Sequence, residues 1–357
     1  MAPSSNTYTQ TADLPEDLFS PAVLWHPEGK GRVRCDLCAH RCSILPGREG
    51  VCKVRINRNG ELVTLVRNRL VASAVDPIEK KPLFHFLPGT LSFSLATMGC
   101  NFRCRYCQNW QISQFRREGG DVAGALSHPG SIVRQALRSG CSTIAYTYTE
   151  PTIFFETAME VGERARAAGL KNIFVSNGYM TPGAAQKARS FLDAANVDLK
   201  SFDDRHYRKV CGARLKGVLE GLEALLAEGY WVEVTTLLVP GVNDSDEELR
   251  AMARYLAKLN PDIPWHLSRF HPDYRMRDTG PTPMERMERA WSLGKEAGLR
   301  YIYLGNVPGD SRESTLCPGC GALVVERRGF TLRSLGLKDG RCASCGREIA
   351  GLWKEDS

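Results

Sequence analysis

Three cysteines lie close together in the stretch GCNFRCRYCQNW, which runs from Gly99 to Trp110. Cys100, Cys104 and Cys107 follow a C-x3-C-x2-C spacing, and no fourth cysteine stands beside them. A structural metal site normally has four protein ligands, whereas an open coordination position marks a site of chemistry. Three thiolates can bind three irons of a four-iron–four-sulfur (4Fe–4S) cluster and leave the fourth iron without a protein ligand. The alternative is an incomplete zinc site that takes its fourth ligand from a distant cysteine or histidine.

Most of the other cysteines form two groups of four. The chain has 13 cysteines, and close C-x2-C or C-x3-C pairs indicate metal binding rather than disulfides in a chain without a secretion signal. The groups are Cys35, Cys38, Cys42 and Cys52 near the N-terminus, and Cys317, Cys320, Cys342 and Cys345 near the C-terminus. Cys141 and Cys211 remain single, and we interpret them as packing residues.

The two groups predict different kinds of site. The C-terminal pairs CPGCG and CASCG have the spacing of a zinc ribbon, whose metal is closed to substrate. The N-terminal group begins with CDLCAHRC and is less regular. It is compatible with a structural zinc ion or with an auxiliary iron–sulfur cluster, and His40 could replace one of its cysteines as a ligand.

Composition places the chain among folded proteins. Hydrophobic residues make up 43% and charged residues 24% of the sequence. The N-terminal stretch MAPSSNTYTQTADLPEDLFS lacks the basic and apolar regions of a secretion signal, and no apolar run reaches the roughly 18 residues of a membrane helix. We therefore expect a cytoplasmic protein without a membrane partner. The net charge of +7 is scattered, without a basic stripe carrying aromatic residues, so nucleic-acid binding is not expected.

A long alternation of apolar strands and amphipathic helices fills the middle of the chain. Strands are predicted at 91–97, 142–148, 172–176, 196–200, 231–238, 265–270 and 301–304. Helices are predicted at 153–168, 182–194, 216–228, 245–259 and 283–297. This order indicates βαβ units and a parallel sheet, and the absence of a GxGxxG turn favours a partial (β/α)6-type barrel over a Rossmann sheet. The expected organisation is a flexible N-terminal arm (1–30), a Cys-rich module (31–88), the barrel (89–306) and a zinc-ribbon module (307–357).

Polar residues gather where these strands end. In a parallel barrel, chemistry lies at the carboxyl ends of the strands. The ends read TMGC, YTYTEPT, VSNGYM, VDLKS, LLVPGVND and SRFHPD in chain order. The α/β fold therefore predicts one shared pocket that contains the three-cysteine loop.

The cysteine spacing, the aromatic Tyr106 before the third cysteine, and the position after the first barrel strand together resemble the radical SAM superfamily. The resemblance implies that the open iron binds the amino and carboxylate groups of S-adenosylmethionine (SAM). It also implies that one electron cleaves SAM to methionine and a 5′-deoxyadenosyl radical, which abstracts hydrogen from a substrate. The barrel would then be a radical SAM barrel.

The resemblance assigns cofactor contacts to further strand ends. Glu150, in Thr149-Glu150-Pro151, lies where the superfamily binds the methionine amino group, and its alternative role is a helix N-cap. Ser176 and Asn177 would hydrogen-bond the carboxylate or the ribose, or form a plain strand-to-helix turn. Asp198 and Lys200 resemble the Asp-x-Lys pair that lines the pocket in glycyl-radical-enzyme activases, with a solvent-facing ion pair as the alternative.

Two later strand ends carry weaker matches. The stretch LLVPGVND, ending at Asp244, resembles the turn that holds adenine through backbone groups. His271 lies where the activases also have a histidine, and Arg269 beside it could bind an acidic group. For each of these two residues a structural role is the alternative.

Beyond the N-terminal arm the whole chain resembles the AmmeMemoRadiSam-system radical SAM enzymes, which are pyruvate-formate-lyase-activating-enzyme-like. The stretches EKKPLFHFLPG, MGCNFRCRYCQNWQIS, AYTYTEPTIFFE, YLGNVPG and CPGCGALVVERRGF carry this resemblance. The family name implies association with MEMO-type and AMMECR1-type proteins, so one of these could be partner or substrate, but family membership leaves the physiological substrate open. We expect the substrate to be a protein or peptide partner and the electron donor to be a protein such as a flavodoxin or ferredoxin.

Three other functions are compatible with parts of the sequence. A small-molecule radical SAM enzyme would be supported by a second iron–sulfur cluster at the N-terminus. A glycyl-radical-enzyme activase is weakened because the ferredoxin-like insertion that many activases carry after the cluster motif is missing. A zinc-ribbon nucleic-acid-binding protein would explain neither the barrel nor the three-cysteine loop.

Overall fold

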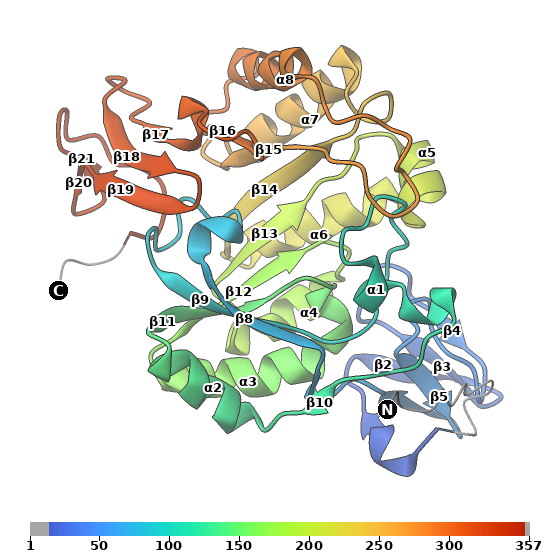
Figure 1. The fold of residues 1–357 in the computed structure, drawn as a ribbon. Helices are drawn as coiled ribbons and strands as arrows, with labels where there is room; N and C mark the ends of the chain where they lie inside the picture. Colours follow the sequence, from blue (N-terminus) through green and yellow to red (C-terminus); the bar gives the residue numbers. More distant parts are fainter. Residues whose placement is uncertain (1–13, 354–357) are drawn as a thin grey trace, which may run out of the picture.

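The computed structural model describes residues 14–353. Its centre is an eight-stranded sheet in the order β16-β15-β14-β13-β12-β11-β9-β8 (Figure 1). Its strands are β8 (Ala72–Pro77), β9 (Leu91–Ala96), β11 (Cys141–Tyr146), β12 (Lys171–Ser176), β13 (Ala194–Asp198), β14 (Trp231–Leu238), β15 (Trp265–Arg269) and β16 (Ile302–Gly305). All of them run parallel except β8, which pairs antiparallel with β9. The predicted α/β class and parallel sheet are confirmed, and the sheet is open, with β8 and β16 at its edges.

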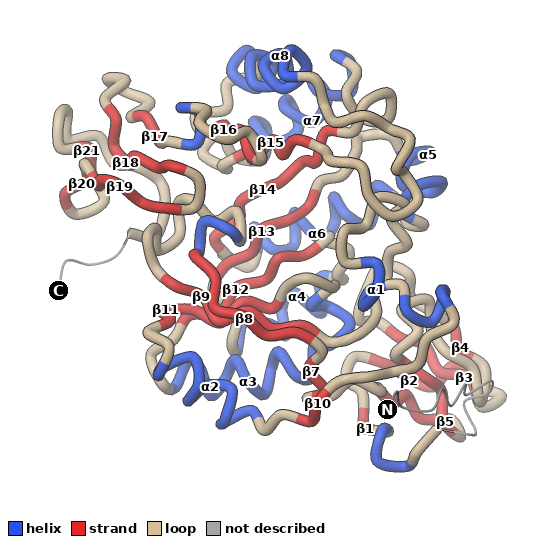
Figure 2. Tube along the Cα trace, in the orientation of Figure 1, coloured by secondary structure: helices blue, strands red, loops and turns tan. Residues whose placement is uncertain are grey.

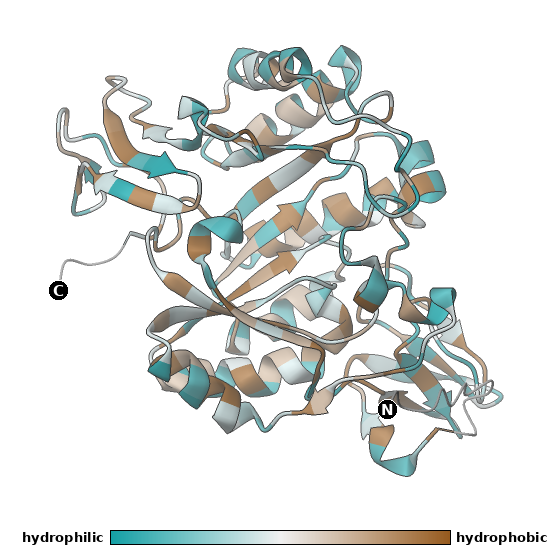
Figure 3. Ribbon diagram, in the orientation of Figure 1, coloured by the Kyte–Doolittle hydropathy of each residue, from teal (hydrophilic) through white to brown (hydrophobic). Residues whose placement is uncertain are grey.

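Helices connect the parallel strands, as the long crossovers between such strands require. The helices are α2 (Pro129–Arg138), α3 (Phe155–Ala167), α4 (Pro182–Lys187), α6 (Leu215–Ala227), α7 (Asp246–Leu259) and α8 (Met284–Glu296). Figure 2 shows them alternating with the strands along the chain. Their apolar faces pack on strands that are buried on both sides, and Figure 3 shows the resulting hydrophobic centre. No helix within residues 14–353 is long and apolar enough to cross a bilayer.

The structure differs from the expected elements at three places. The helix expected over 182–194 ends at Lys187, and a 3-10 turn (Ala188–Ser190) follows it. The chain then enters β13 at Ala194, because Ala194–Val197 pair with both β12 and β14 and are buried there. The antiparallel strand β8 and helix α2 are not among the predicted elements.

The N-terminal module consists of two small antiparallel sheets. One has the order β1-β6-β5 and the other β2-β3-β4. The strands are β1 (Ser20–Pro21), β2 (Trp25–Gly29), β3 (Arg32–Cys35), β4 (Ser43–Ile44), β5 (Arg55–Arg58) and β6 (Glu61–Thr64). The flexible arm expected over 1–30 is therefore not seen at 14–30, since β1 and β2 pair with the module and Ala22 is buried in the core. The rest of that expectation, residues 1–13, lies outside the described residues.

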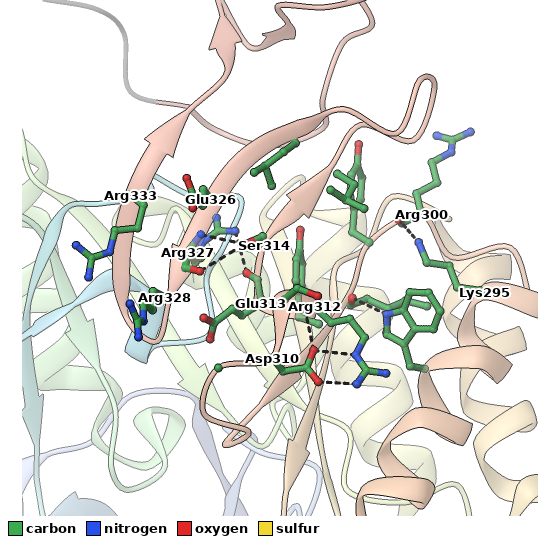
Figure 4. A pocket seen from close by; sticks show the side chains of 18 residues that line it. Lys295, Arg300, Asp310, Arg312, Glu313, Ser314, Glu326, Arg327, Arg328 and Arg333 are labelled. Atoms are coloured by element: carbon green, nitrogen blue, oxygen red, sulfur yellow. Dashed lines mark hydrogen bonds and ion pairs between the residues drawn. The ribbon is translucent and has the colours of Figure 1, made fainter.

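The C-terminal module packs against one edge of the sheet. It contains β17 (Thr315–Leu316), β18 (Leu323–Arg328), β19 (Thr331–Leu335), β20 (Leu337–Lys338) and β21 (Arg341–Cys342). The backbone of Leu352 joins it to the segment between β8 and β9 through hydrogen bonds with His85 and Leu87, both of 2.7 Å. A cleft of about 740 Å³ lies between β16, α8 and this module. Figure 4 shows the side chains that line it, among them Lys295, Arg300 and Arg312. None of its lining residues belongs to the three-cysteine loop.

His85 makes this junction sensitive to acid. The side chain is fully buried, with Nδ1 2.6 Å from the Ala350 carbonyl oxygen, and burial lowers its pKa from 6.5 to about 4. Because the pKa is lower in the folded chain, the contribution of His85 to stability is present above pH 6.5 and is lost as the pH falls toward 4.

Between pH 7 and pH 5 we expect the free energy of unfolding to fall by about 2 kcal/mol through this residue. Urea denaturation of wild type and His85→Gln at both pH values measures this difference, with the exposed His26→Gln as control. An equal pH dependence in wild type and His85→Gln would contradict the prediction.

Helix α6 lies directly on the turn that follows β12. A Cβ atom at Gly221 would lie 1.9 Å from the Gly178 carbonyl oxygen, and that turn cannot yield without moving Asn177. We expect Gly221→Ala to lower the free energy of unfolding by about 1–3 kcal/mol, the usual cost of overpacking. Gly183→Ala in α4 is the matched control, because the nearest atom to its Cβ is 4.0 Å away. Thermal denaturation compares the two variants, and an unchanged melting temperature of Gly221→Ala would show that the turn is not fixed by this contact.

Candidate metal and cofactor site at the strand ends

The three-cysteine loop follows β9 directly. Gly99 turns the chain with a φ of +99°, a conformation that favours glycine. The Phe102 N–H then donates to Cys100 Sγ at 3.3 Å, and Cys107 Sγ lies 3.2 Å from the Ser113 hydroxyl in α1 (Trp110–Ser113). The three sulfurs do not all lie within 4.8 Å of one another. Their spacing therefore exceeds that of ligands around a single metal ion, and it suits a larger polynuclear group.

The sulfurs share one pocket of about 250 Å³ with the ends of the parallel strands. The lining includes Cys100, Cys104, Cys107, Tyr148, Glu150, Asn177, Asp198, Lys200, Thr235, Ser268 and Asn306. Of the predicted cofactor contacts, the structure thus brings Glu150, Asn177, Asp198 and Lys200 to the cysteines. Ser176 is buried behind them, and His271 is not part of the lining.

Glu150 is fixed in a buried network of donors. Its Oε1 accepts from the Thr152 N–H (3.0 Å), the Thr152 hydroxyl (2.6 Å) and the Ser176 hydroxyl (2.8 Å). Its Oε2 accepts from the Asn177 N–H at 2.8 Å. Glu150 is therefore the N-cap of the turn Pro151–Phe154, and Oε2 has acceptor capacity for a further donor in the pocket. Burial raises the pKa of Glu150, and the hydrogen bonds oppose that shift.

Asp198 and Lys200 form an ion pair at the end of β13. Lys200 Nζ lies 2.8 Å from Asp198 Oδ2. The Lys200 side chain is 15% exposed and the Asp198 side chain is 32% exposed. Burial acts against the charge of Lys200, but the charge of Asp198 raises its pKa well above the ordinary value. Both side chains line the pocket, so an ammonium group lies in the same pocket as Cys104.

The Ser176–Gly178 turn supports the other side of the pocket. Asn177 Nδ2 donates to Asn101 Oδ1 at 2.7 Å, next to Cys100 in the chain. A Cβ atom at Gly178 would lie 2.7 Å from Val197 Cγ1, and the φ of this residue is +69°. Glycine is therefore required where this turn packs on the sheet.

The last two predicted strand ends have other roles in the structure. His271 is exposed, with its Nδ1 3.1 Å from the Pro272 carbonyl oxygen, and Arg269 Nε donates to the Thr282 carbonyl at 2.7 Å. The loop that contains His271 instead covers the cysteine loop, since Tyr274 stacks on Trp110 at 5.2 Å and 11°. In LLVPGVND, Leu237 lines the pocket, and Asn243 Nδ2 donates to the Lys200 carbonyl at 2.7 Å.

Several residues at the site were not predicted from the sequence. Ser268 and Asn306 follow the same rule of position at strand ends, and Asn306 Nδ2 donates to the Ser268 hydroxyl at 2.9 Å. Cys211 is fully buried, as expected for a packing residue, but its thiol also hydrogen-bonds with Cys104 and lies 3.7 Å from the Tyr106 hydroxyl. It ends the π-helical turn η7 (Tyr207–Cys211), and turns of this kind are frequent at functional sites.

The surroundings of the three thiols favour their neutral form, because they raise the pKa of each. Burial raises the pKa of Cys100 and Cys107, and the hydrogen bond with Cys211 raises the pKa of Cys104. Metal ligation requires thiolates, so binding would release these protons. Three such sulfurs, a carboxylate with spare acceptor capacity and a lysine in one pocket fit an iron–sulfur cluster with a zwitterionic ligand.

The C-terminal cysteines have a different arrangement. Sγ atoms of Cys317 and Cys345 lie 3.6 Å apart, and those of Cys320 and Cys342 lie 3.8 Å apart. All four sulfurs lie within 4.8 Å of one another, so this group can hold one metal ion. The N-terminal cysteines Cys35, Cys38, Cys42 and Cys52 line a narrow cavity, and no three of their sulfurs lie within that distance of one another. His40 is not in the lining of this cavity, and its Nε2 lies 2.8 Å from the Asn101 carbonyl oxygen.

Comparison with known proteins agrees with this site. A family model described as the radical SAM superfamily matches residues 95–255, which contain the three cysteines and the pocket carboxylates. The uncharacterised protein MJ0808 of Methanocaldococcus jannaschii is 42% identical over 331 residues, which cover 92% of this chain and 98% of that protein. The choline trimethylamine-lyase activating enzyme of Oleidesulfovibrio alaskensis is 28% identical over 101 residues, 28% of this chain and 33% of that enzyme.

Among solved structures, a domain of a pyruvate-formate lyase-activating enzyme from Bacteroides vulgatus matches 45% of this chain and 98% of its own, with 17% identity and a TM-score of 0.41. The family model carries the assignment, because it covers the cysteine loop and the ends of the strands from β9 to β14. The family match and the relative that covers nearly the whole chain show that the chain belongs to the radical SAM superfamily.

Proposed function

We propose that this protein is a radical SAM enzyme that acts on a protein or peptide partner. Superfamily membership implies a 4Fe–4S cluster and SAM. When bound, they supply a 5′-deoxyadenosyl radical that abstracts hydrogen from a substrate. The observation that carries the proposal is the position of Cys100, Cys104 and Cys107 in the same pocket as the strand-end residues Glu150 and Lys200.

Different residues of the pocket would hold different parts of the cofactor. The three thiolates would bind three irons of the cluster. Glu150 Oε2 would accept from the methionine ammonium as a charge-assisted hydrogen bond, and Asn177 and Ser176 would fix the Glu150 carboxylate in place. Lys200, held by Asp198, would keep a positive charge beside the cluster. The stacked pair Trp110 and Tyr274 would exclude water from one side.

The finer assignment is an activating-enzyme-like member of the AmmeMemoRadiSam system. The activating enzyme among the relatives supports it, and so do the stretches EKKPLFHFLPG and YLGNVPG. We propose MEMO-type or AMMECR1-type proteins as partners, a flavodoxin or ferredoxin as the electron donor, and a cytoplasmic location. The C-terminal group would bind zinc, because sulfurs at about 2.3 Å from a tetrahedral zinc lie about 3.8 Å apart.

A surface of the C-terminal module supports a protein partner. Leu316, Leu323 and Phe330 are each about half exposed, at 54%, 48% and 51%. Leu316 and Leu323 are cross-strand partners in β17 and β18, and adjoining exposed apolar side chains are typical of an interaction surface.

The source of the abstracted hydrogen tests the proposal. Candidate partner proteins are produced in deuterated medium and incubated without oxygen with the reconstituted enzyme, SAM and a reductant. We expect deuterium in the 5′-deoxyadenosine when the correct partner is present, and none with the Leu323→Ser/Phe330→Ser variant at limiting partner. SAM cleavage that transfers no deuterium from any protein, but does so from a deuterated small-molecule extract, would overturn the protein substrate.

A further inference from the structure

The four N-terminal cysteines are spaced differently from the C-terminal ones. In the C-terminal group the closest sulfurs are 3.6 and 3.8 Å apart, the separation that one tetrahedral zinc requires. Among Cys35, Cys38, Cys42 and Cys52, no three sulfurs lie within 4.8 Å of one another. The same is true of Cys100, Cys104 and Cys107. The N-terminal group therefore shares the wider spacing of the cluster site.

These four sulfurs nevertheless face a common interior. They line one cavity together with apolar side chains from Leu37, Ile44 and Ile153. Gly50 is part of the wall, and a Cβ atom there would lie 3.6 Å from Cys42 Sγ and 3.3 Å from Ile44 Cδ1. The wall thus lacks a side chain beside a sulfur, where a group larger than a single ion needs room.

A buried cation completes the cavity. Arg55 is 1% exposed, and its Nη1 donates to Cys35 Sγ at 3.8 Å. Its Nε has no hydrogen-bond partner among the described residues. Four thiolates around a metal centre carry net negative charge, which the guanidinium of Arg55, paired on its other side with Glu156, offsets in part. Hydrogen bonds to the sulfurs and nearby charge also tune the reduction potential of iron–sulfur clusters.

The cavity lies beside the three-cysteine loop. A Cβ atom at Gly99 would lie 3.0 Å from the Cys52 carbonyl oxygen, so the backbones next to Cys100 and at Cys52 are in direct contact. Arg117 joins the two loops, since its Nη2 donates to the Val51 carbonyl at 2.8 Å and its Nη1 to the Phe102 carbonyl at 3.5 Å.

The outer side of the same module reaches the surface. Cys42 is partly exposed, and the neighbouring side chains of Leu45 and Val51 are 45% and 39% exposed. The module therefore presents apolar side chains to solvent near Cys42 and also touches the three-cysteine loop.

We propose that Cys35, Cys38, Cys42 and Cys52 hold a second iron–sulfur cluster that relays electrons to the cluster at Cys100, Cys104 and Cys107. The relay rests on the proposed function, whereas the metal assignment does not. A one-electron donor protein would dock at the Leu45 and Val51 face and be oxidised by one electron. The N-terminal cluster gains that electron and loses it to the cluster in the barrel, so it returns to its starting state without any bond being made or broken.

Metal content tests the assignment on the unaltered full-length chain. After anaerobic reconstitution we expect about eight irons per chain, four for each cluster, and about one zinc. About four irons and two zincs would overturn the proposal, because the N-terminal group would then be a zinc site. This measurement does not depend on a variant that could fail to fold.

A variant then tests the relay. In Cys38→Ser/Cys42→Ser we expect the loss of about four irons, with the C-terminal zinc retained. SAM cleavage driven by dithionite, a small reductant that can reach the barrel cluster itself, should continue, whereas cleavage driven by a reduced flavodoxin should fall to the level without donor. Cys141→Ser, outside every cysteine group, is the matched control and should lose no iron.

Two results with Cys38→Ser/Cys42→Ser would overturn the proposal. Flavodoxin-driven cleavage equal to that of wild type would overturn the relay, and loss of zinc without loss of iron would overturn the cluster. If wild type holds eight irons but never cleaves SAM, the proposed function fails while the second cluster stands.

Discussion

Replacing Glu150 by glutamine should weaken SAM binding by roughly 10- to 150-fold, the equivalent of one charge-assisted hydrogen bond of about 1.5–3 kcal/mol. The reason lies in how the carboxylate is held. Oε1 already accepts from Thr152 and Ser176, whereas Oε2 accepts only from the Asn177 N–H and faces the pocket. Glutamine keeps the shape but removes the negative charge that an ammonium ligand would bind. Equilibrium dialysis of SAM against the reconstituted protein gives the two dissociation constants.

The iron content and the melting temperature of Glu150→Gln show whether the fold and the cluster are intact. Glu247→Gln, an exposed position in α7, is the matched control and should bind SAM as wild type does. If Glu150→Gln retains its iron and binds SAM with unchanged affinity, Glu150 serves only as a helix cap.

The second large effect concerns the ion pair that ties the N-terminal module to the barrel. Arg55 in β5 and Glu156 in α3 are paired, and their side chains are only 2% and 4% exposed. Glu156→Gln would leave the guanidinium charge buried without its partner. Breaking a buried pair in this way typically costs about 3–5 kcal/mol. We expect a loss of that size in the free energy of unfolding, measured by urea denaturation at pH 7.

An exposed ion pair supplies the control for this prediction. Arg189 and Glu228 are 3.2 Å apart, and the Arg189 side chain is 66% exposed. Glu228→Gln should cost less than about 1 kcal/mol, as is usual for surface pairs. The double variant Arg55→Met/Glu156→Met should recover part of the lost stability, because it removes both buried charges. Equal effects of Glu156→Gln and Glu228→Gln would show that burial does not strengthen the inner pair.

The sequence predicted the central sheet because its pattern is local. Each parallel strand is a short apolar run followed by polar residues, and the polar residues mark the carboxyl end. That rule placed Glu150, Asp198 and Lys200 beside the cysteines, and all of them line the same pocket. The same rule, applied to the end of the last strand β16, also points to Asn306.

Contacts between distant segments could not be predicted in this way. Cys211 reaches Cys104 because a π-helical turn after β13 folds back over the cysteine loop. His271 does not line the pocket, and its loop instead contacts the cysteine loop through the stacking of Tyr274 on Trp110. The expected flexible arm contains short strands that become ordered only by pairing with β3 and β6. In each case the determining partner lies far away in the sequence.

The same limit applies to the metals. The C-x2-C pairs predicted two four-cysteine groups, but only three-dimensional spacing separates a compact set of sulfurs, such as that around Cys317, from a wide one, such as that around Cys35. The choice between an ion and a cluster depends on how the turns hold the sulfurs. Sequence spacing alone is compatible with a single metal ion and with a cluster.

The most direct test of the account is iron content and 5′-deoxyadenosine formation, measured together in the anaerobically reconstituted protein. Wild type is compared with a Cys100→Ala/Cys104→Ala/Cys107→Ala variant. We predict that wild type forms 5′-deoxyadenosine from SAM under reduction, and that the variant loses about four irons and all of this activity while its zinc remains. A wild-type protein that binds only zinc and never cleaves SAM would contradict the assignment of the three-cysteine loop as a radical SAM site.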